Sequence, residues 1–377
     1  MGVSEVVTDQ KSRVEGFVLR RGIGMRKSKM FVFLVLVLAL AMIAAACADD
    51  AETTTTAAAS GDGEPASGPK GIIRFTFAPD PVWDYLQDSG IKDEMEEEAG
   101  ILILAAPTWN EFGVYAGGHA DIGSVGSFEV PLLVKESGRP AVVFGKYNMT
   151  RAVIAAPTDS PAESICDIPA DSDIAIYDTV GPALLWGVIF EQECGMDYRA
   201  TGGDFNLTLA DITNTAQLAL DHEVAAAQIL PDFSIPQLMS GDIKILDGGK
   251  TAPGWIGEIV GGAYEGPMTN IFLAREEWYD EHLEEVAFFA KMWQRGLDDW
   301  QQKKYEIIES YPQHFAAETD EQIQFIKDYL DANDWFVKDF YLTQDWIDKE
   351  TKVFDLMRES GFMGDDEKNP RFEVLTP

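Results

Sequence analysis

The sequence predicts an α/β protein of two lobes, each a mostly parallel sheet flanked by helices, followed by a helical C-terminal extension. First, short β-like runs alternate with helical stretches from Gly71 onward, which is typical of a largely parallel sheet. Second, residues 71–377 are more than one hydrophobic core usually serves. Third, apolar residues recur at helical spacing in much of residues 276–360.

The first 47 residues have the features of an export signal. Basic residues from Arg20 to Lys29 precede an apolar run, residues 31–46, and small residues lead to Cys47. The run has 16 residues and a spanning helix needs about 20, so a permanent transmembrane segment is the less favoured alternative. The stretch 44–47 (AAAC) resembles the lipobox of bacterial lipoproteins, with alanine in place of the usual leucine. This resemblance implies a signal peptide at 1–46, lipidation of Cys47 and attachment to the extracytoplasmic face of the bacterial cell membrane.

Residues 47–70 are expected to form a flexible tether, because they contain too few bulky apolar side chains to bury a core. Beyond residue 46 the chain keeps 22 basic and 61 acidic residues, a net charge of −39. Such a surface would repel nucleic acid and anionic lipid. We therefore expect no nucleic-acid partner, and the excess charge is best explained by solubility.

The first lobe is expected to begin with residues 71–148. Ile72 opens the first predicted strand, Pro79 and Pro81 end it, and a single helix is expected over 82–98. The other predicted strands are 101–105, 120–123, 141–145 and 151–155, and the other predicted helices are 110–116 and 128–135. The chain is expected to leave this lobe near Asn148.

The second lobe is expected to occupy residues 149–255, and residues 256–377 are expected to return to the first lobe as helices. Predicted strands are 174–177, 204–208, 226–230 and 243–246, and predicted helices are 182–193, 211–220 and 233–239. A long helix is expected over 276–310, and later helices near 319–330 and 343–360 are expected to brace the first lobe. The stripe of the long helix is expected to be core rather than a ligand platform; it comprises Val286, Phe289, Trp293, Leu297 and Trp300.

Cys166 and Cys194 are the cysteines that remain beside Cys47. An exported chain with two such cysteines favours a disulfide, which would add about 3 kcal/mol in the chain-entropy model. Two reduced, buried thiols are the alternative.

The sequence lacks the usual motifs of catalysis and cofactor binding. G-x-S-x-G, G-x-G-x-x-G, G-x-x-x-x-G-K-[ST] and H-E-x-x-H are all missing. Four histidines leave little material for acid-base or metal chemistry. We expect no catalytic residue, no metal and no cofactor.

The order of elements resembles the type II periplasmic-binding-protein fold, in particular the receptors for nitrate, sulfonates and taurine and the related thiamine-precursor receptors. Residues 117–123 (GGHADIG) are similar to the family's aGeaDig segment, and 284–289 (EEVAFF) to the helix after its last crossover. Gly181 follows as the family's helix-opening turn would. The chain departs from the family around Cys166, where a Gly-Lys pair is missing.

In open α/β sheets ligands bind beyond the carboxyl ends of strands, where helix N-termini present free N–H groups. The site is therefore expected between the lobes. Trp83 could equally be core, and Ser124, Ser127, Glu129 and Asp178 could be helix caps. The candidate ligand-binding residues are Asp80, Trp83, Thr108, Trp109, Ser124, Ser127, Phe128, Glu129, Tyr147, Asn148, Asp178, Thr179, Gly181, Asp232, Glu258 and Tyr264.

The resemblance implies a monomeric solute receptor that closes by a hinge and delivers its solute to an ABC permease and ATPase. Aromatic and acidic candidates favour a nitrogen-containing organic solute over nitrate or sulfonate. A sensor lipoprotein is one alternative. A pyrimidine-synthase-like enzyme on the same fold is another, although it would need a cysteine-rich iron site that this sequence does not contain.

Overall fold

The structure is a computed structural model that describes residues 68–262 and 264–376. The predicted signal peptide, the lipidation site Cys47 and most of the tether lie outside the described residues. In the part of the chain that is described, no helix is long and apolar enough to cross a membrane.

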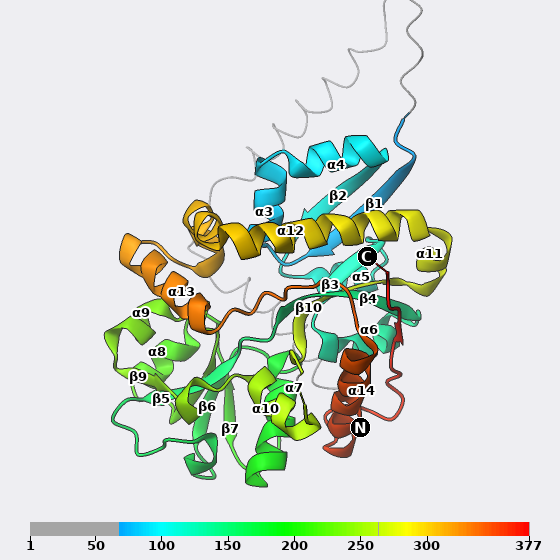
Figure 1. Cartoon of the computed structure of the whole chain (residues 1–377). Helices are drawn as coiled ribbons and strands as arrows, with labels where there is room; N and C mark the ends of the chain where they lie inside the picture. Colours follow the sequence, from blue (N-terminus) through cyan, green and yellow to red (C-terminus); the bar gives the residue numbers. More distant parts are fainter. Residues whose placement is uncertain (1–67, 263, 377) are drawn as a thin grey trace, which may run out of the picture. The chain divides into compact units, whose positions relative to one another are not determined.

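The first lobe is built on a six-stranded sheet in the order β11-β4-β10-β3-β1-β2 (Figure 1). β1 pairs in parallel with β2 and β3, whereas β10 runs antiparallel between β3 and β4. The strands are β1 (Gly71–Phe77), β2 (Ile101–Pro107), β3 (Ile122–Val125), β4 (Ala141–Met149), β10 (Met268–Arg275) and β11 (Arg371–Phe372).

The helices of this lobe differ from the predicted ones at two breaks. The predicted helix 82–98 is two helices, because Gly90 has a φ of 78° that a continuing helix does not allow. The predicted helix 276–310 is also two, separated at His282. The helices are α3 (Pro81–Asp88), α4 (Ile91–Ala99), α5 (Glu111–Ala116), η1 (Ser127–Glu129), α6 (Val130–Ser137), α11 (Glu276–Glu281) and α12 (Leu283–Ser310).

The aromatic stripe of α12 is core, as predicted. Phe289 and Trp293 pack against Phe75 on β1, with ring centroids 4.9 and 6.0 Å from it. All five residues of the stripe are at most 1% exposed. Close packing of aromatic rings at these distances stabilises the lobe beyond the area that it buries.

The second lobe has a five-stranded sheet in the order β7-β6-β8-β5-β9. β6 pairs in parallel with β7 and β8, and β5 is antiparallel to β8 and β9. Its strands are β5 (Val153–Pro157), β6 (Asp173–Ile176), β7 (Asn206–Leu209), β8 (Ala226–Ile229) and β9 (Ile243–Ile245). Its helices are η2 (Ile165–Asp167), α7 (Pro182–Ile189), η3 (Phe190–Cys194), α8 (Thr215–Leu220), η4 (Pro231–Phe233), α9 (Ile235–Ser240), η5 (Asp247–Gly249) and α10 (Ala252–Val260).

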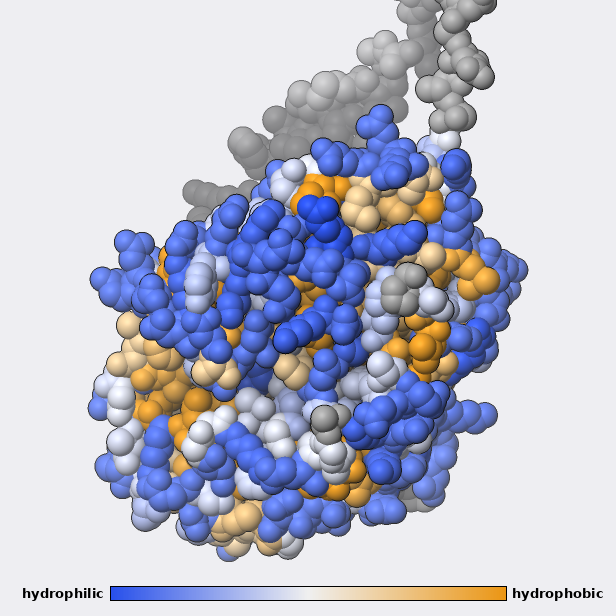
Figure 2. Space-filling model, in the orientation of Figure 1, coloured by the Kyte–Doolittle hydropathy of each residue, from blue (hydrophilic) through white to orange (hydrophobic). Residues whose placement is uncertain are grey.

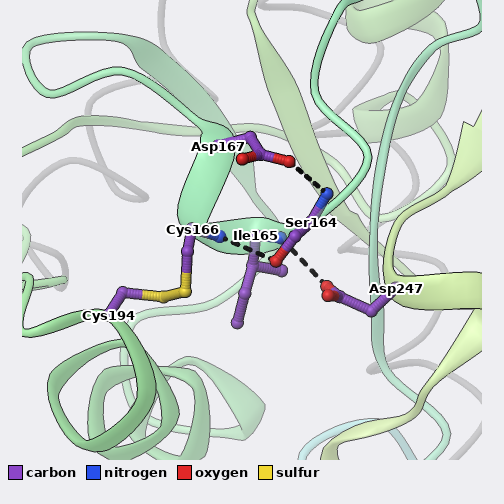
Figure 3. The surroundings of a disulfide bond; sticks show 6 residues. All are labelled: Ser164, Ile165, Cys166, Asp167, Cys194 and Asp247. Carbon is purple, nitrogen blue, oxygen red and sulfur yellow. Dashed lines mark hydrogen bonds between the residues drawn. A yellow bond between two sulfur atoms is a disulfide. The ribbon is translucent and has the colours of Figure 1, made fainter.

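The predicted disulfide between Cys166 and Cys194 is present, with a Cα–Cα distance of 5.2 Å (Figure 3). It joins η2 to the end of η3. The η2 turn is also fixed by side chains, because Ser164 accepts a hydrogen bond from the Cys166 amide and Asp247 accepts one from the Ile165 amide. The disulfide therefore attaches the end of η3 to a turn that is already held in place.

Two chain segments join the lobes, residues 150–152 and 264–267. They lie side by side, since the Thr150 amide donates to the Pro267 carbonyl at 3.0 Å. The return was expected at residue 256, but α10 belongs to the second lobe, where Trp255 and Ile256 are in its core. The chain re-enters the first sheet at Met268. The antiparallel strands β5 and β10 each follow one of these crossings directly, which explains why the sheets are less parallel than predicted.

The C-terminal extension contacts both lobes and does not brace the first lobe alone. Its helices are η6 (Pro312–Phe315), α13 (Asp320–Ala332) and α14 (Gln344–Glu359). The start of α14 adds Trp346 to the first core, and its later turns add Phe354 to the second. Between the helices, the Met149 amide donates to the Trp335 carbonyl at 2.7 Å, and the Lys146 amide donates to the Phe340 carbonyl at 2.8 Å. The extension therefore covers the outer edge of β4.

The surface is largely hydrophilic on the face drawn in Figure 2, with separate apolar patches. This agrees with the large excess of acidic residues in the chain.

Candidate functional site

Loops from the two lobes meet where their strands end. Trp109 follows β2 in the first lobe, and its ring lies 6.2 Å from that of Phe233 in the second lobe. Phe128, in η1 of the first lobe, is 2% exposed and belongs to the core of the second. The strand-end loops therefore form one region between the lobes, as expected for this class of sheet.

Carboxylates cap the helix starts in this region. Asp80, at the N-terminus of α3, accepts hydrogen bonds from the amides of Val82 and Trp83 at 2.8 and 3.1 Å. Asp178, just before α7, accepts one from the Ala183 amide at 3.3 Å. Each carboxylate occupies N–H groups that a free helix start would offer to a ligand.

Glu129 plays a similar part in the turn after β3, where it accepts a hydrogen bond from the Gly126 amide at 2.8 Å. Its burial, followed by the charges of Asp178 and Glu111, raises its pKa to about 8. Since Glu129 and Glu111 belong to the first lobe and Asp178 to the second, carboxyl groups of both lobes act on each other across the region.

Burial also raises the pKa of the neighbouring carboxyls. The pKa of Asp178 is raised to about 6 by desolvation, against the effect of its amide hydrogen bonds. The pKa of Asp80 is likewise raised to about 6, although the Tyr147 hydroxyl donates to it. Burial raises the pKa of Glu111 to about 6. These groups give up part of their hydration without gaining a full set of cationic partners.

A buried ion pair lies at the crossing between the lobes. The Arg151 guanidinium donates to both oxygens of Asp232, from Nε at 2.8 Å and from Nη2 at 2.7 Å. It also lies over the Trp335 ring of the C-terminal extension, 4.9 Å from its centroid. Arg151 follows β4, whereas Asp232 belongs to η4 of the second lobe, so the pair ties the crossing segment to the second lobe.

The predicted site residues divide into two groups. In the first group, Asp80 is paired with Tyr147, Glu129 with Asp178, and Asp232 with Arg151. Trp109 is 70% exposed and lies at the edge of the region. Thr108 precedes it, and Thr179 and Gly181 lie in the loop that leads to α7.

The remaining predicted residues are buried in a core or strand, or lie on the surface of α10. Trp83 is 2% exposed and stacks on Trp293 in the core, so its interpretation as a core residue is the correct one. Phe128 is buried in the core of the second lobe, and Ser124 is buried within β3. Glu258 forms an exposed ion pair with Lys250 at 2.6 Å.

Three further predicted residues face the C-terminal extension. Asn148 forms a bridge with Phe336. Tyr264 donates to Glu350 on α14, and Ser127 hydrogen-bonds with the same carboxylate. The sequence could not show this arrangement, because more than 200 residues separate Ser127 from Glu350.

Four residues of the region were not predicted: Glu111, Arg151, Gln228, whose side-chain nitrogen lies 3.4 Å from Asp178 Oδ2, and Tyr177, which directly precedes Asp178. Arg151 could have been found, since it is a basic residue within the first crossing of an acidic chain. Gln228 could also have been found, because it is a polar side chain inside an apolar strand.

A surface pocket of about 420 Å³ lies elsewhere, lined by Arg139, Arg275, Trp278 and three glutamates. It lies where β4 begins and β10 ends, at the other end of the first sheet from the crossings. We place the candidate site between the lobes, because the buried carboxylates and the strand ends are found there.

Solved structures share this architecture. The periplasmic aliphatic sulphonate-binding protein SsuA of Escherichia coli is 14% identical, with a TM-score of 0.63 over 81% of this chain and 93% of that one. A sulfonate-binding protein of a putative ABC transporter from Methylobacillus flagellatus is 16% identical, with a TM-score of 0.57 over 79% and 91% of the two chains. A Candida albicans gene product with the generic periplasmic binding protein fold is 10% identical, with a TM-score of 0.53 over 81% and 98%.

This chain has the periplasmic binding protein fold. No protein-family model matches the sequence, and no curated protein matches it either. The fold confirms the predicted two-lobed α/β architecture.

Proposed function

We propose that the chain is an extracytoplasmic solute-binding protein that delivers a small, nitrogen-containing organic solute to an ABC importer and catalyses no reaction. The observation that carries this proposal is the meeting of strand-end loops from both lobes around buried polar side chains. A solute held there would contact both lobes at once. Several proteins of the same fold are binding components of import systems, which supports the same role.

The proposed mechanism is hinge closure about the two crossing segments. Residues 150–152 and 264–267 are paired by a backbone hydrogen bond, and each leads directly into a strand of the next sheet. A solute favours the closed form only through the additional contacts that it makes there. The closed form would be recognised by the permease, with the receptor monomeric and anchored through Cys47.

The proposal is tested by a thermal-shift screen of the purified protein against a library of small nutrients. A solute that binds only the native state raises the melting temperature. For the solute found, Trp109→Ala should weaken binding by roughly three- to tenfold, which is the usual contribution of one aromatic contact.

Trp109 is exposed, so its replacement should leave the melting temperature of the free protein unchanged. Trp278→Ala on α11 is the matched control, since it removes a tryptophan at the other end of the first sheet. An unchanged affinity in Trp109→Ala would place the ligand elsewhere. A library with no binder would contradict the receptor role.

A further inference from the structure

At three positions between the lobes, backbone N–H groups that could bind an anionic solute are occupied by the protein's own carboxylates. Asp80 occupies the start of α3, Asp178 that of α7, and Glu129 the amide of Gly126. Helix starts attract anions through these same groups and through the helix dipole. An anionic solute would have to displace a capping carboxylate or lie against it.

The basic side chains near these carboxylates are also paired. Arg151 is held by both oxygens of Asp232, and His314, whose charge acts on Asp80, lies 2.7 Å from Asp84. In the described part of the chain, neither therefore offers an unshared positive charge to a solute. The region has an excess of negative charge that burial makes costly.

A second, independent observation concerns Gln228, which is fully buried on β8. Its side-chain nitrogen lies 3.4 Å from Asp178 Oδ2, and its side-chain oxygen has no partner among the described residues. A buried amide oxygen without a partner is costly and can only accept a hydrogen bond. An N–H group of a solute beside Asp178 would satisfy it.

From these contacts we propose that the region between the lobes selects organic cations, with an ammonium or amidinium group held between Glu129 of the first lobe and Asp178 of the second, and that it excludes sulfonates and other anions. This inference rests on the proposed receptor function and specifies its substrate class. A cation placed between Glu129 and Asp178 would favour the ionised form of both carboxyl groups and attract both lobes. The charge of the solute would thus favour closure directly.

Binding of a cation should also change the protonation of Glu129. Near neutral pH, Glu129 carries a proton in the free protein, because its pKa lies near 8. A bound cation favours the ionised form, so binding should release up to one proton. An uncharged solute would have no such effect.

The test compares charged probes with neutral ones of the same shape. Choline is paired with dimethylbutanol and putrescine with butanediol, and ethanesulfonate serves as the anion. At pH 7, choline or putrescine should raise the melting temperature and its neutral partner should not. Calorimetry in two buffers of different ionisation enthalpy should show proton release for the cation that binds.

Glu129→Gln and Asp178→Asn keep an oxygen for the capping hydrogen bonds and remove the charge. Each should weaken binding of the cation by about tenfold or more, the usual effect of losing one charged hydrogen bond. Glu97→Gln, on an exposed face of α4, is the matched control and should leave the affinity unchanged.

Tighter binding of ethanesulfonate, equal binding of a neutral partner, binding of a divalent metal ion alone, or unchanged affinity in both charge variants would overturn the inference. If only an uncharged or anionic solute from the library binds, and Trp109→Ala weakens it, the receptor function stands and the cation assignment fails. If no solute of any class binds, the receptor function fails as well.

Discussion

The free energy of unfolding should fall as the pH rises from 6 to 7, because buried Glu350 and largely buried Glu129 hold protons in the folded state that the unfolded chain releases. Burial raises the pKa of Glu129 to about 8 and that of Glu350 to about 7, from an ordinary value of 4.5. Between pH 6 and 7 the folded protein therefore binds up to two protons more than the unfolded chain at these positions. Stability falls with rising pH wherever the folded state binds more protons.

The magnitude follows from linkage. Each proton held only by the folded state contributes a slope of about 1.4 kcal/mol per pH unit. The two glutamates together should give roughly 2 kcal/mol or somewhat more over this pH unit, since Glu350 is already losing its proton near pH 7. As the pH falls below 6 the free energy of unfolding rises further, until near pH 4.5 the unfolded chain also binds protons at these positions.

The assay is urea unfolding at several pH values from 6 to 7, with the free energy of unfolding taken from midpoint and slope. Glu129→Gln should make the dependence on pH shallower by about 1.4 kcal/mol per pH unit, and Glu350→Gln by about 1 kcal/mol or slightly more. Comparing each variant with the unmodified protein cancels every other titration. Exposed Glu97→Gln should leave the dependence as it is. A stability that stays constant or rises from pH 6 to 7, or a Glu129→Gln variant with the original slope, would refute the reasoning.

Three further predictions concern the crossing, the disulfide and the C-terminal extension. Asp232→Ala leaves the buried Arg151 charge without its partner and should lower the free energy of unfolding by about 3–5 kcal/mol. In a double-mutant cycle, adding Arg151→Ala should recover part of this loss. Removing the disulfide with Cys166→Ser and Cys194→Ser together should cost about 3 kcal/mol, measured as a lower urea midpoint that a reductant does not lower further. Gly145→Ala places a methyl group against the Phe340 ring and should lower the free energy of unfolding by about 1–3 kcal/mol, and it should speed protease cleavage after residue 335. Gly257→Ala on α10 is the control. Its methyl group meets no atom closer than 3.7 Å, so it should not destabilise the protein.

Local patterns in the sequence were sufficient to predict most of the strands. The predicted strands at 72–77, 101–105 and 174–177 each match an observed strand within one or two residues. β10 was missed, although it lies at the centre of the first sheet. Its residues are almost all buried on both faces, so it shows no alternation, and it lies between a glycine-rich stretch and a helix.

The positions where helices end were also only partly predictable from local patterns in the sequence. Residues 82–98 have a continuous apolar pattern, and Gly90 is the one local signal of the turn that separates α3 from α4. The predicted return at residue 256 falls inside α10, because Pro253 in the first turn and the glycines of this helix hid it in the sequence. In both cases the glycine or proline is compatible with either a helix or a turn, and only the packing of the folded chain decides between them.

For the site, the sequence indicated which loops meet but not what each side chain does in them. Asp178 follows a predicted strand and precedes a predicted helix, a position suited to capping, to binding a ligand or to both. The contacts of Asp178 with the Ala183 amide and with Gln228 exist only once β6, α7 and β8 are assembled. Sequence alone could therefore identify the residue but not its contacts.

The C-terminal extension bears on how the lobes can move. α14 places Trp346 in the first core and Phe354 in the second, so it cannot remain fixed to both lobes during a large rotation about the crossings. Between these contacts, Glu350 is fully buried against Tyr264 in the crossing segment and Ser127 in the first lobe. Because packed cores resist gradual deformation, a rotation must either be small or release one end of α14. The lobes are therefore joined by the two crossings and by the C-terminal extension. A solute that closes the lobes must supply enough binding free energy to offset any loss of packing around α14.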